Sequence, residues 1–318
     1  MLHCRRQTRV KELRIGGGDR RGFAIDPPFE VLAPSEHTLP FVFASPHSGR
    51  VYPKSFLQAT RLDGTAIRRS EDSFVDEIFG AAPTFGAPLI KAHFPRAFVD
   101  PNREPYELDQ AMFDSPLPQY VNSRSPRVLA GLGTIARVVR DGAEIYGRKI
   151  SFHEALMRID TYYKPYHAAL RSALDATHKK FNFAALIDCH SMPSIGGPLD
   201  QDIGATRPDS VLGDRFGTSC ARRMTDMVER ALAMQGFAVV RNNPYAGGYS
   251  TEHYGRPAVG LHTLQIEINR ALYMDEERME RTAGLKRVTS AITTLIRAMS
   301  EVDWRFLRPA ISSSQAAQ

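Results

Sequence analysis

Short apolar segments alternate with amphipathic ones along most of the 318-residue chain. The short segments are mostly apolar at consecutive positions, which is typical of strands that are covered on both faces of a sheet. We expect strands at 41–45, 88–92, 97–100, 183–188, 237–241 and 263–268. We expect helices at 151–180, 209–235 and 275–300, the first with a possible kink at Pro165. The alternation predicts an α/β fold with a mixed, largely parallel sheet.

Composition changes at the two ends of this pattern. Residues 1–28 are polar and glycine-rich and end in "DPP", which predicts a flexible N-terminal extension. No long linker, repeat or low-complexity tract follows before the tail "SSSQAAQ", so residues 29–310 are expected to form a single domain. The N-terminal residues are basic without an apolar segment after them, so we expect no secretory signal, and no apolar run reaches the ~18 residues that a membrane span needs.

The cysteines and the charge indicate the cellular compartment and the class of partner. The three cysteines form no CxxC pair, which favours a reducing cytoplasm. The net charge of +6 could indicate nucleic-acid binding, but the basic residues are scattered and no aromatic–glycine RNA signature is present. We therefore expect no nucleic-acid and no membrane partner, and we expect some arginines to face a small anionic molecule. The oligomeric state is left open.

Two histidines stand where expected strands end. His47 lies in "SPHSGRVYP", directly after an apolar strand, where it could hold a metal or simply make one hydrogen bond in a loop. In "LIDCHSMPS", Asp188 and His190 should point to one face of the strand and Cys189 to the other. A carboxylate beside a histidine is the arrangement that orients a metal-binding imidazole, although a surface Asp–His pair would look the same.

Carboxylates occur in two further segments. In "RRSEDSFVDEIF", either Glu71 or Asp72 could complete a two-histidine, one-carboxylate zinc set, although acids also favour helix N-termini for structural reasons. In "HTLQIEINR", Glu267 lies on the polar face of an expected strand. It could be a general base beside a metal, or half of a buried ion pair with Arg270 or Arg96.

Two segments could bind a substrate. "FPRAFVDPNRE" offers Arg96, Asn102 and Arg103, and an arginine binds a carboxylate through two parallel hydrogen bonds. "NPYAGGYSTEHYGRP" is a loop with two adjacent glycines, from which Tyr249, His253 and Arg256 could project. The second segment could equally be a plain turn.

Together these segments resemble the N-formylglutamate amidohydrolase family. The matching pieces are "SPHSG", "SEDSFVDEIF", "RAFVDPNRE", "LIDCHSMPS", "NPYAGGYSTEHYG" and "LQIEINRALYMDE", in the order that the family has them. The resemblance implies a three-layer α/β/α fold, like that of zinc exopeptidases, with a single zinc ion. In zinc carboxypeptidases the carboxylate ligand follows the first histidine by three residues, and Arg50 stands at that position here.

The resemblance also implies roles for individual residues. His47, Asp72 and His190 would be the metal ligands, with Asp72 preferred to Glu71, and Asp188 and Glu71 would support them. Glu267 would be the catalytic carboxylate, with Arg103 beside it in the reaction. Asn102 and Arg103 would meet the substrate. From the two segments described above, we also expect Arg96, Tyr249, His253 and Arg256 to bind it.

The implied activity is zinc-dependent hydrolysis of N-formyl-L-glutamate to formate and L-glutamate, as in histidine catabolism. Manganese, cobalt or iron could occupy the same ligand set. The alternatives are a related metal-dependent deacylase acting on another N-acyl amino acid or small amide, a basic nucleic-acid-binding module, and a family member that only binds a ligand.

Overall fold

The computed structural model describes residues 14–15 and 25–309. Its main sheet has seven strands in the order β2-β5-β3-β6-β9-β7-β8. The four neighbours β5, β3, β6 and β9 are parallel, whereas β2 at one edge and the pair β7–β8 at the other edge run antiparallel to them. The strands are β2 (Phe29–Leu32), β3 (Phe41–Ser45), β5 (Leu89–Ala92), β6 (Ala184–Met192), β7 (Ser210–Gly213), β8 (Val239–Arg241) and β9 (Leu261–Asn269). The predicted mixed, largely parallel α/β sheet is confirmed.

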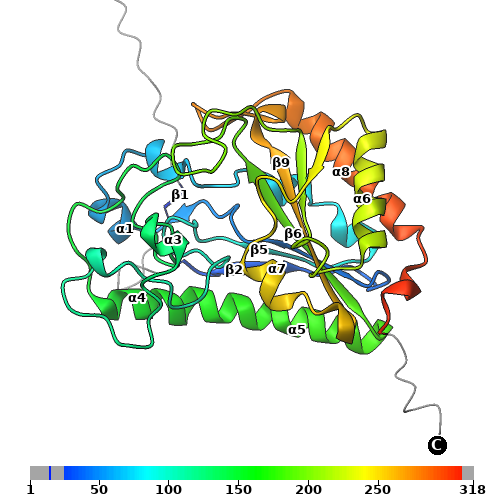
Figure 1. Ribbon diagram of the computed structural model, residues 1–318, viewed down its shortest axis with the longest axis horizontal. Helices are drawn as coiled ribbons and strands as arrows, with labels where there is room; N and C mark the ends of the chain where they lie inside the picture. The colour runs from blue at the N-terminus through cyan, green and yellow to red at the C-terminus, as the bar shows by residue number, and fades with distance from the viewer. Residues whose placement is uncertain (1–13, 16–24, 310–318) are drawn as a thin grey trace, which may run out of the picture.

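Helices cover both faces of this sheet and give it three layers (Figure 1). The helices are α1 (Lys54–Ala59), α2 (Val75–Ile78), α3 (Pro126–Leu129), α4 (Phe152–Arg158), α5 (Lys164–Phe181), α6 (Arg222–Met234), α7 (Tyr249–Tyr254) and α8 (Gly284–Ser300). Two short strand pairs lie outside the sheet: β1 (Arg14–Ile15) with β4 (Val51–Tyr52), and β10 (Met274–Asp275) with β11 (Glu280–Arg281).

Alternation along the strands builds two separate apolar cores. Phe41 and Phe43 of β3 pack with α2, α6 and α8, whereas Val42 and Ala44 of the same strand pack on the side of α4 and α5. Every residue of β6 is buried. Because both faces are covered, consecutive apolar residues suit these strands, which is why the pattern identifies them.

Three predicted elements differ from the structure. Residues 97–100 form a turn and not a strand: the Phe98 N–H donates to the Pro95 carbonyl over 2.9 Å, and the apolar side chains of the run are buried under α4 and α5. The helix expected at 209–235 begins only at Arg222, because Ser210–Gly213 pair with β9. The helix expected at 275–300 begins at Gly284, after the pair β10–β11.

The long helix expected at 151–180 is interrupted by a π-helical turn at Ile159–Tyr163. The π-helical turn ends two residues before Pro165 and includes Thr161, the residue whose carbonyl a proline at position 165 crowds. Most of the predicted extension at 1–28 lies outside the described residues, and the single domain over 29–310 stays a prediction. Among the described helices, none combines the length and the apolar character that a bilayer crossing requires.

Candidate metal centre and cavity

The carboxyl ends of β3, β6 and β9 meet beside one another, and polar residues replace apolar ones there. Along β6, Leu186 is buried in the core on the side of α5, and Asp188 and His190 continue the same face beyond it. Cys189 points the other way, into the second core. The Asp188 Oδ1 and His190 Nε2 atoms lie 3.0 Å apart. The strand thus presents a carboxylate-supported imidazole at its end, as the alternation predicts.

His47 follows β3, the neighbour of β6, and a second carboxylate orients it. Its Nε2–H donates to Asp100 Oδ1 over 2.7 Å. Its Nδ1 atom is buried and forms no hydrogen bond with any described residue, although Asp72 Oδ2 lies 3.3 Å away. A buried imidazole nitrogen with a free lone pair requires a partner, and a metal ion is one such partner.

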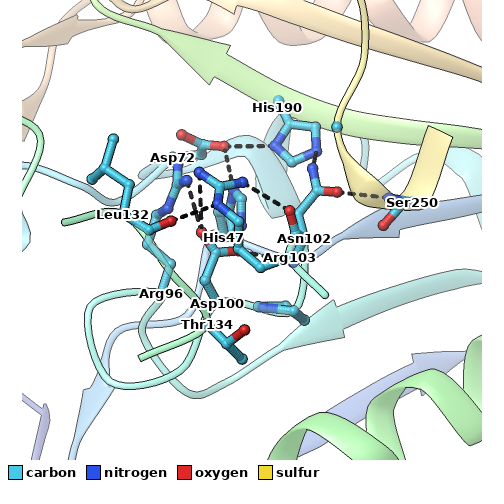
Figure 2. Close-up of polar contacts among 12 residues, drawn as sticks. His47, Asp72, Arg96, Asp100, Asn102, Arg103, Leu132, Thr134, His190 and Ser250 are labelled. Carbon is cyan, nitrogen blue, oxygen red and sulfur yellow. Dashed lines mark hydrogen bonds and ion pairs between the residues drawn. The ribbon is translucent and has the colours of Figure 1, made fainter. Parts of the chain in front are cut away.

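Asp72 completes a cluster of three buried side chains (Figure 2). The Asp72 Oδ2 atom lies 2.9 Å from His190 Nδ1, and its Oδ1 atom accepts a hydrogen bond from Arg270 Nη2 over 2.8 Å. The Asp72 N–H donates to the His47 carbonyl over 3.0 Å, which fixes this loop against the end of β3. Although burial alone would raise the pKa of Asp72, the hydrogen bond with His190 and the proximity of His47 and Arg270 hold it well below its usual value.

One potential ligand atom from each of these residues lies within 4.8 Å of the others. Each imidazole also has a carboxylate on its second nitrogen, which is the usual support of a metal-ligating histidine. Two imidazoles and one carboxylate with room for a further ligand suit zinc, so the residues fit a divalent ion. In the ranges that the structure describes, no other group of three His, Cys, Asp or Glu side chains is gathered in this way.

Glu71 takes no part in this cluster. Its carboxylate accepts hydrogen bonds from Tyr52 Oη over 2.6 Å, from Ser73 Oγ over 2.7 Å and from the Arg68 guanidinium. Of the two neighbouring acids, Asp72 is therefore the one that faces the histidines. Glu71 instead anchors the loop that carries Asp72.

Glu267 lies beside the cluster because β9 pairs with β6 in the register that sets it opposite His190. Its Oε1 atom accepts a hydrogen bond from Gln265 Nε2 over 2.8 Å, and the Gln265 Oε1 atom accepts one from the Gly248 N–H over 2.8 Å. Burial raises the pKa of Glu267 to about 7; the charge of Asp72 adds to this shift and His190 opposes it. This carboxyl can gain and lose a proton near neutral pH.

The loop after residue 95 supplies a second layer of polar contacts (Figure 2). The Arg96 Nη2 group donates to Asp100 Oδ2 over 2.9 Å. Asn102 Nδ2 lies 3.2 Å from His190 Nε2, and Asn102 Oδ1 accepts the Ser250 N–H over 2.8 Å. The Arg103 guanidinium donates from Nε to the Leu132 carbonyl and from Nη1 to the Asn102 carbonyl, each over 2.8 Å.

A cavity of about 430 Å³ opens over these groups. Its walls include the three cluster residues and Arg96, Asn102, Arg103 and Glu267. The predicted substrate contacts Tyr249, His253 and Arg256 do not line it. Tyr249 and His253 stack on each other along α7, with their Oη and Nδ1 atoms 3.2 Å apart, and Arg256 precedes the short 3₁₀ turn at Pro257–Val259.

Other lining residues were not anticipated from the sequence. Arg127 of α3 and Arg140 border the cavity, and Asp100 supports His47. Both arginines belong to a long segment of turns and short helices, where no periodic pattern indicates the direction of a side chain. Asp100 could have been found, because it opens the "DPNR" part of a segment that had already been singled out.

Comparison with known proteins identifies one family. A model of the family described as N-formylglutamate amidohydrolase matches residues 39–274. The chain is 28% identical over 252 residues to the N-formylglutamate deformylase of Pseudomonas aeruginosa, covering 78% of this chain and 87% of the relative. It is 25% identical over 250 residues to the N-formylglutamate deformylase of Pseudomonas putida, covering 78% and 86%.

Solved structures give the same result. The crystal structure of N-formylglutamate amidohydrolase from Ralstonia eutropha JMP134 has a TM-score of 0.79 and 37% sequence identity, covering 86% of this chain and 97% of that one. A gene product of Agrobacterium tumefaciens shares the fold, with a TM-score of 0.63, 17% identity and coverage of 88% and 96%. From the family match and the extent of these likenesses, we conclude that the chain belongs to the N-formylglutamate amidohydrolase family.

Proposed function

We propose that this protein hydrolyses the formyl amide of N-formyl-L-glutamate, giving formate and L-glutamate, with a single divalent metal ion held by His47, Asp72 and His190. The observation that carries the proposal is the buried cluster itself, with its three potential ligand atoms within 4.8 Å and Glu267 alongside. The names of the relatives support the formylated substrate. Zinc is the first candidate, because the ligand set of two imidazoles and one carboxylate is typical of catalytic zinc.

A divalent ion in this cluster would polarise the formyl carbonyl and make a water molecule more acidic. Glu267 would take the proton of the attacking water and pass it to the amine as the carbon–nitrogen bond breaks. A pKa of about 7 suits a group that must perform both transfers. Asp100 and Asp188 would keep the two imidazole rings oriented through their second nitrogens.

Arg103 and Asn102 would act on the substrate from the same wall of the cavity. Arg103 is fixed by two backbone carbonyls and keeps donor capacity, so it can bind a carboxylate or share the charge of the developing oxyanion. Arg96 donates to Asp100 and would act mainly through His47. The proposed partner is thus a small anionic N-acyl amino acid. Buried free thiols at Cys189 and Cys220 are compatible with the cytoplasm that we propose as its location.

Formate release from N-formyl-L-glutamate tests the proposal directly. We expect turnover by the wild-type protein, loss of turnover on treatment with a chelator, and recovery on addition of a divalent ion. Glu267→Gln should lower kcat at least about 100-fold. Glu277→Gln, a change at an exposed glutamate, should leave kcat unaltered.

Undiminished formate release by Glu267→Gln would exclude Glu267 as the general base. If the wild-type protein released no formate but hydrolysed another N-acyl amino acid in a panel of such compounds, the related deacylase activity would replace the proposed one.

A further inference from the structure

Arg127 differs from the other arginines that line the cavity. Arg96 is paired with Asp100, and the guanidinium of Arg103 donates to two carbonyls. Arg140 Nη2 donates to Asp200 Oδ2 over 2.6 Å and contacts the Tyr245 hydroxyl. For the Arg127 guanidinium, the structure gives no hydrogen bond or ion pair to any described residue. Arg127 therefore presents an uncompensated charge to the cavity.

The backbone around Arg127 is well fixed although its side chain is unpaired. Ser125 caps α3, with its Oγ atom accepting the Val128 N–H over 3.1 Å. The Leu132 N–H donates to the Arg127 carbonyl over 2.8 Å, and the Leu132 carbonyl in turn accepts from Arg103. One short loop thus holds both arginines at the cavity, so their relative positions are set before any ligand binds.

Three arginines of the cavity lining, Arg96, Arg103 and Arg127, lie close enough for their charges to interact. Burial, together with the charges of Arg127 and Arg96, lowers the pKa of Arg103 to about 10 in spite of the opposing effect of Asp100. Like charges in a confined space favour the entry of an anion. The substrate proposed above carries two carboxylates, and both need such partners.

The two arginines differ in how directly they are connected to the metal cluster. Arg103 is next to Asn102, which touches His190, and is close to Asp100, which touches His47. No hydrogen bond or ion pair joins the Arg127 guanidinium to any of these described residues. In N-formyl-L-glutamate, the α-carboxylate is on the carbon that bears the amide nitrogen, whereas the side-chain carboxylate is further from the bond that breaks. Arg103 is thus suited to groups near the reacting amide, and Arg127 to the more remote carboxylate.

We infer that Arg127 binds the side-chain carboxylate of the substrate and makes the enzyme select N-acyl derivatives of dicarboxylic amino acids. The inference rests on the proposed function and adds the residue that discriminates between an acidic and a neutral side chain. A guanidinium recognises a carboxylate through two parallel charge-assisted hydrogen bonds. The corresponding amide side chain of glutamine cannot accept both of them.

The test compares kcat/KM for N-formyl-L-glutamate and N-formyl-L-glutamine in the wild-type protein, in Arg127→Gln and in Arg124→Gln. Arg124 is an exposed arginine of the same segment that does not line the cavity, so it is the matched control. In Arg127→Gln we expect kcat/KM for the glutamate derivative to fall about 10- to 100-fold, with a similar fall in the ratio of the two substrates. Arg124→Gln should keep the wild-type ratio.

A ratio that stays unchanged in Arg127→Gln, whether both substrates keep their rates or both lose them equally, overturns the inference. Calorimetry with the product L-glutamate separates this result from failure of the proposed function. We expect L-glutamate to bind Arg127→Gln at least about 10-fold more weakly than it binds the wild-type protein and Arg124→Gln. Equal binding by all three proteins contradicts the role of Arg127, even if none of them releases formate.

Discussion

Glu267 has a hydrogen-bond partner on its own strand. Gln265 lies two residues earlier on the same face of β9, and its amide group donates to the Glu267 carboxylate over 2.8 Å. The Gly248 N–H fixes that amide by donating to its oxygen. A Cβ atom at Gly248 would come within 2.4 Å of the Asn102 side chain, so only glycine allows the loop to approach this closely. The loop before α7 therefore fixes the amide that donates to the Glu267 carboxylate.

This network predicts a pH dependence. A general base works only when ionised, so kcat/KM should rise with pH through an acid limb that reports Glu267, whose buried carboxyl has a pKa of about 7. A bound cation favours the carboxylate, so we expect the limb at or below pH 7. Gln265→Met removes a donor to the carboxylate and should shift the limb upward by about one pH unit. Identical pH–rate profiles for the two proteins would rule out this control of Glu267.

The sequence predicts part of the site at this scale and leaves part undecided. Alternation along a strand correctly sets Asp188 and His190 on one face and Cys189 on the other, because strand geometry dictates it. No such rule applies to Glu71 and Asp72, which lie in a loop. Their directions follow from distant hydrogen bonds, such as those from Tyr52 to Glu71 and from Arg270 to Asp72.

At the scale of elements, the π-helical turn between α4 and α5 faces the loop that carries Asp100, Asn102 and Arg103. Tyr163, the last residue of this turn, donates its hydroxyl to the Arg103 carbonyl over 2.7 Å. One turn later, His167 Nε2 donates to the Pro101 carbonyl over 2.8 Å. Burial lowers the pKa of His167 to about 4, so it is neutral at physiological pH. The helix therefore holds the loop from behind, as π-turns near functional sites often do.

Removal of one hydroxyl tests this support. Tyr163→Phe should lower kcat about 10-fold and weaken metal binding, because Asn102 and Asp100 lose a fixed backbone, while stability falls by only about 1 kcal/mol. Tyr166→Phe is the matched control on the same helix, since the Tyr166 hydroxyl is buried without a hydrogen-bond partner among the described residues. Steady-state kinetics and metal titration of both variants make the comparison. Equal kcat and metal affinity in the two would argue against a positioning role for Tyr163.

The predicted elements fail where tertiary contacts override a local pattern. Residues 97–100 look like a strand because they are apolar, but their backbone closes a turn on Pro95 and their side chains enter the core beside α4. Ser210–Gly213 form β7, which pairs with β9, although a helical pattern follows them closely. In both cases a short apolar run is compatible with more than one backbone, and only the distant partner decides.

On the scale of the whole molecule, one sheet separates two apolar cores and carries the site at the carboxyl ends of its parallel strands. Ligands commonly bind at the carboxyl ends of the strands in α/β sheets, because the strand ends and their loops converge there. The apolar composition of the strands therefore predicts the three-layer arrangement, and the polar residues that follow them predict a site at their carboxyl ends. The loops between residues 100 and 150 complete the cavity, and their irregular sequence gives no comparable rule.

The apolar core on the side of α2, α6 and α8 can be tested with two residues of α6. Leu232 is completely buried against the sheet, whereas Met234, two residues later, is 84% exposed. Leu232→Ala should lower the free energy of unfolding by about 2–5 kcal/mol because it leaves a cavity. Met234→Ala should change it by less than about 0.5 kcal/mol. Urea unfolding of the two variants measures the difference, and similar losses in both would contradict the assignment of this face of α6 to the core.

The central claim is that one divalent ion joins His47, Asp72 and His190. Calorimetric titration of zinc into protein that has been stripped of metal tests it most directly. We predict one ion bound per chain by the wild-type protein, and at least about 100-fold weaker binding by His190→Ala, which removes one ligand of three. Absence of zinc binding by the folded wild-type protein, or the same affinity in His190→Ala, would contradict the account.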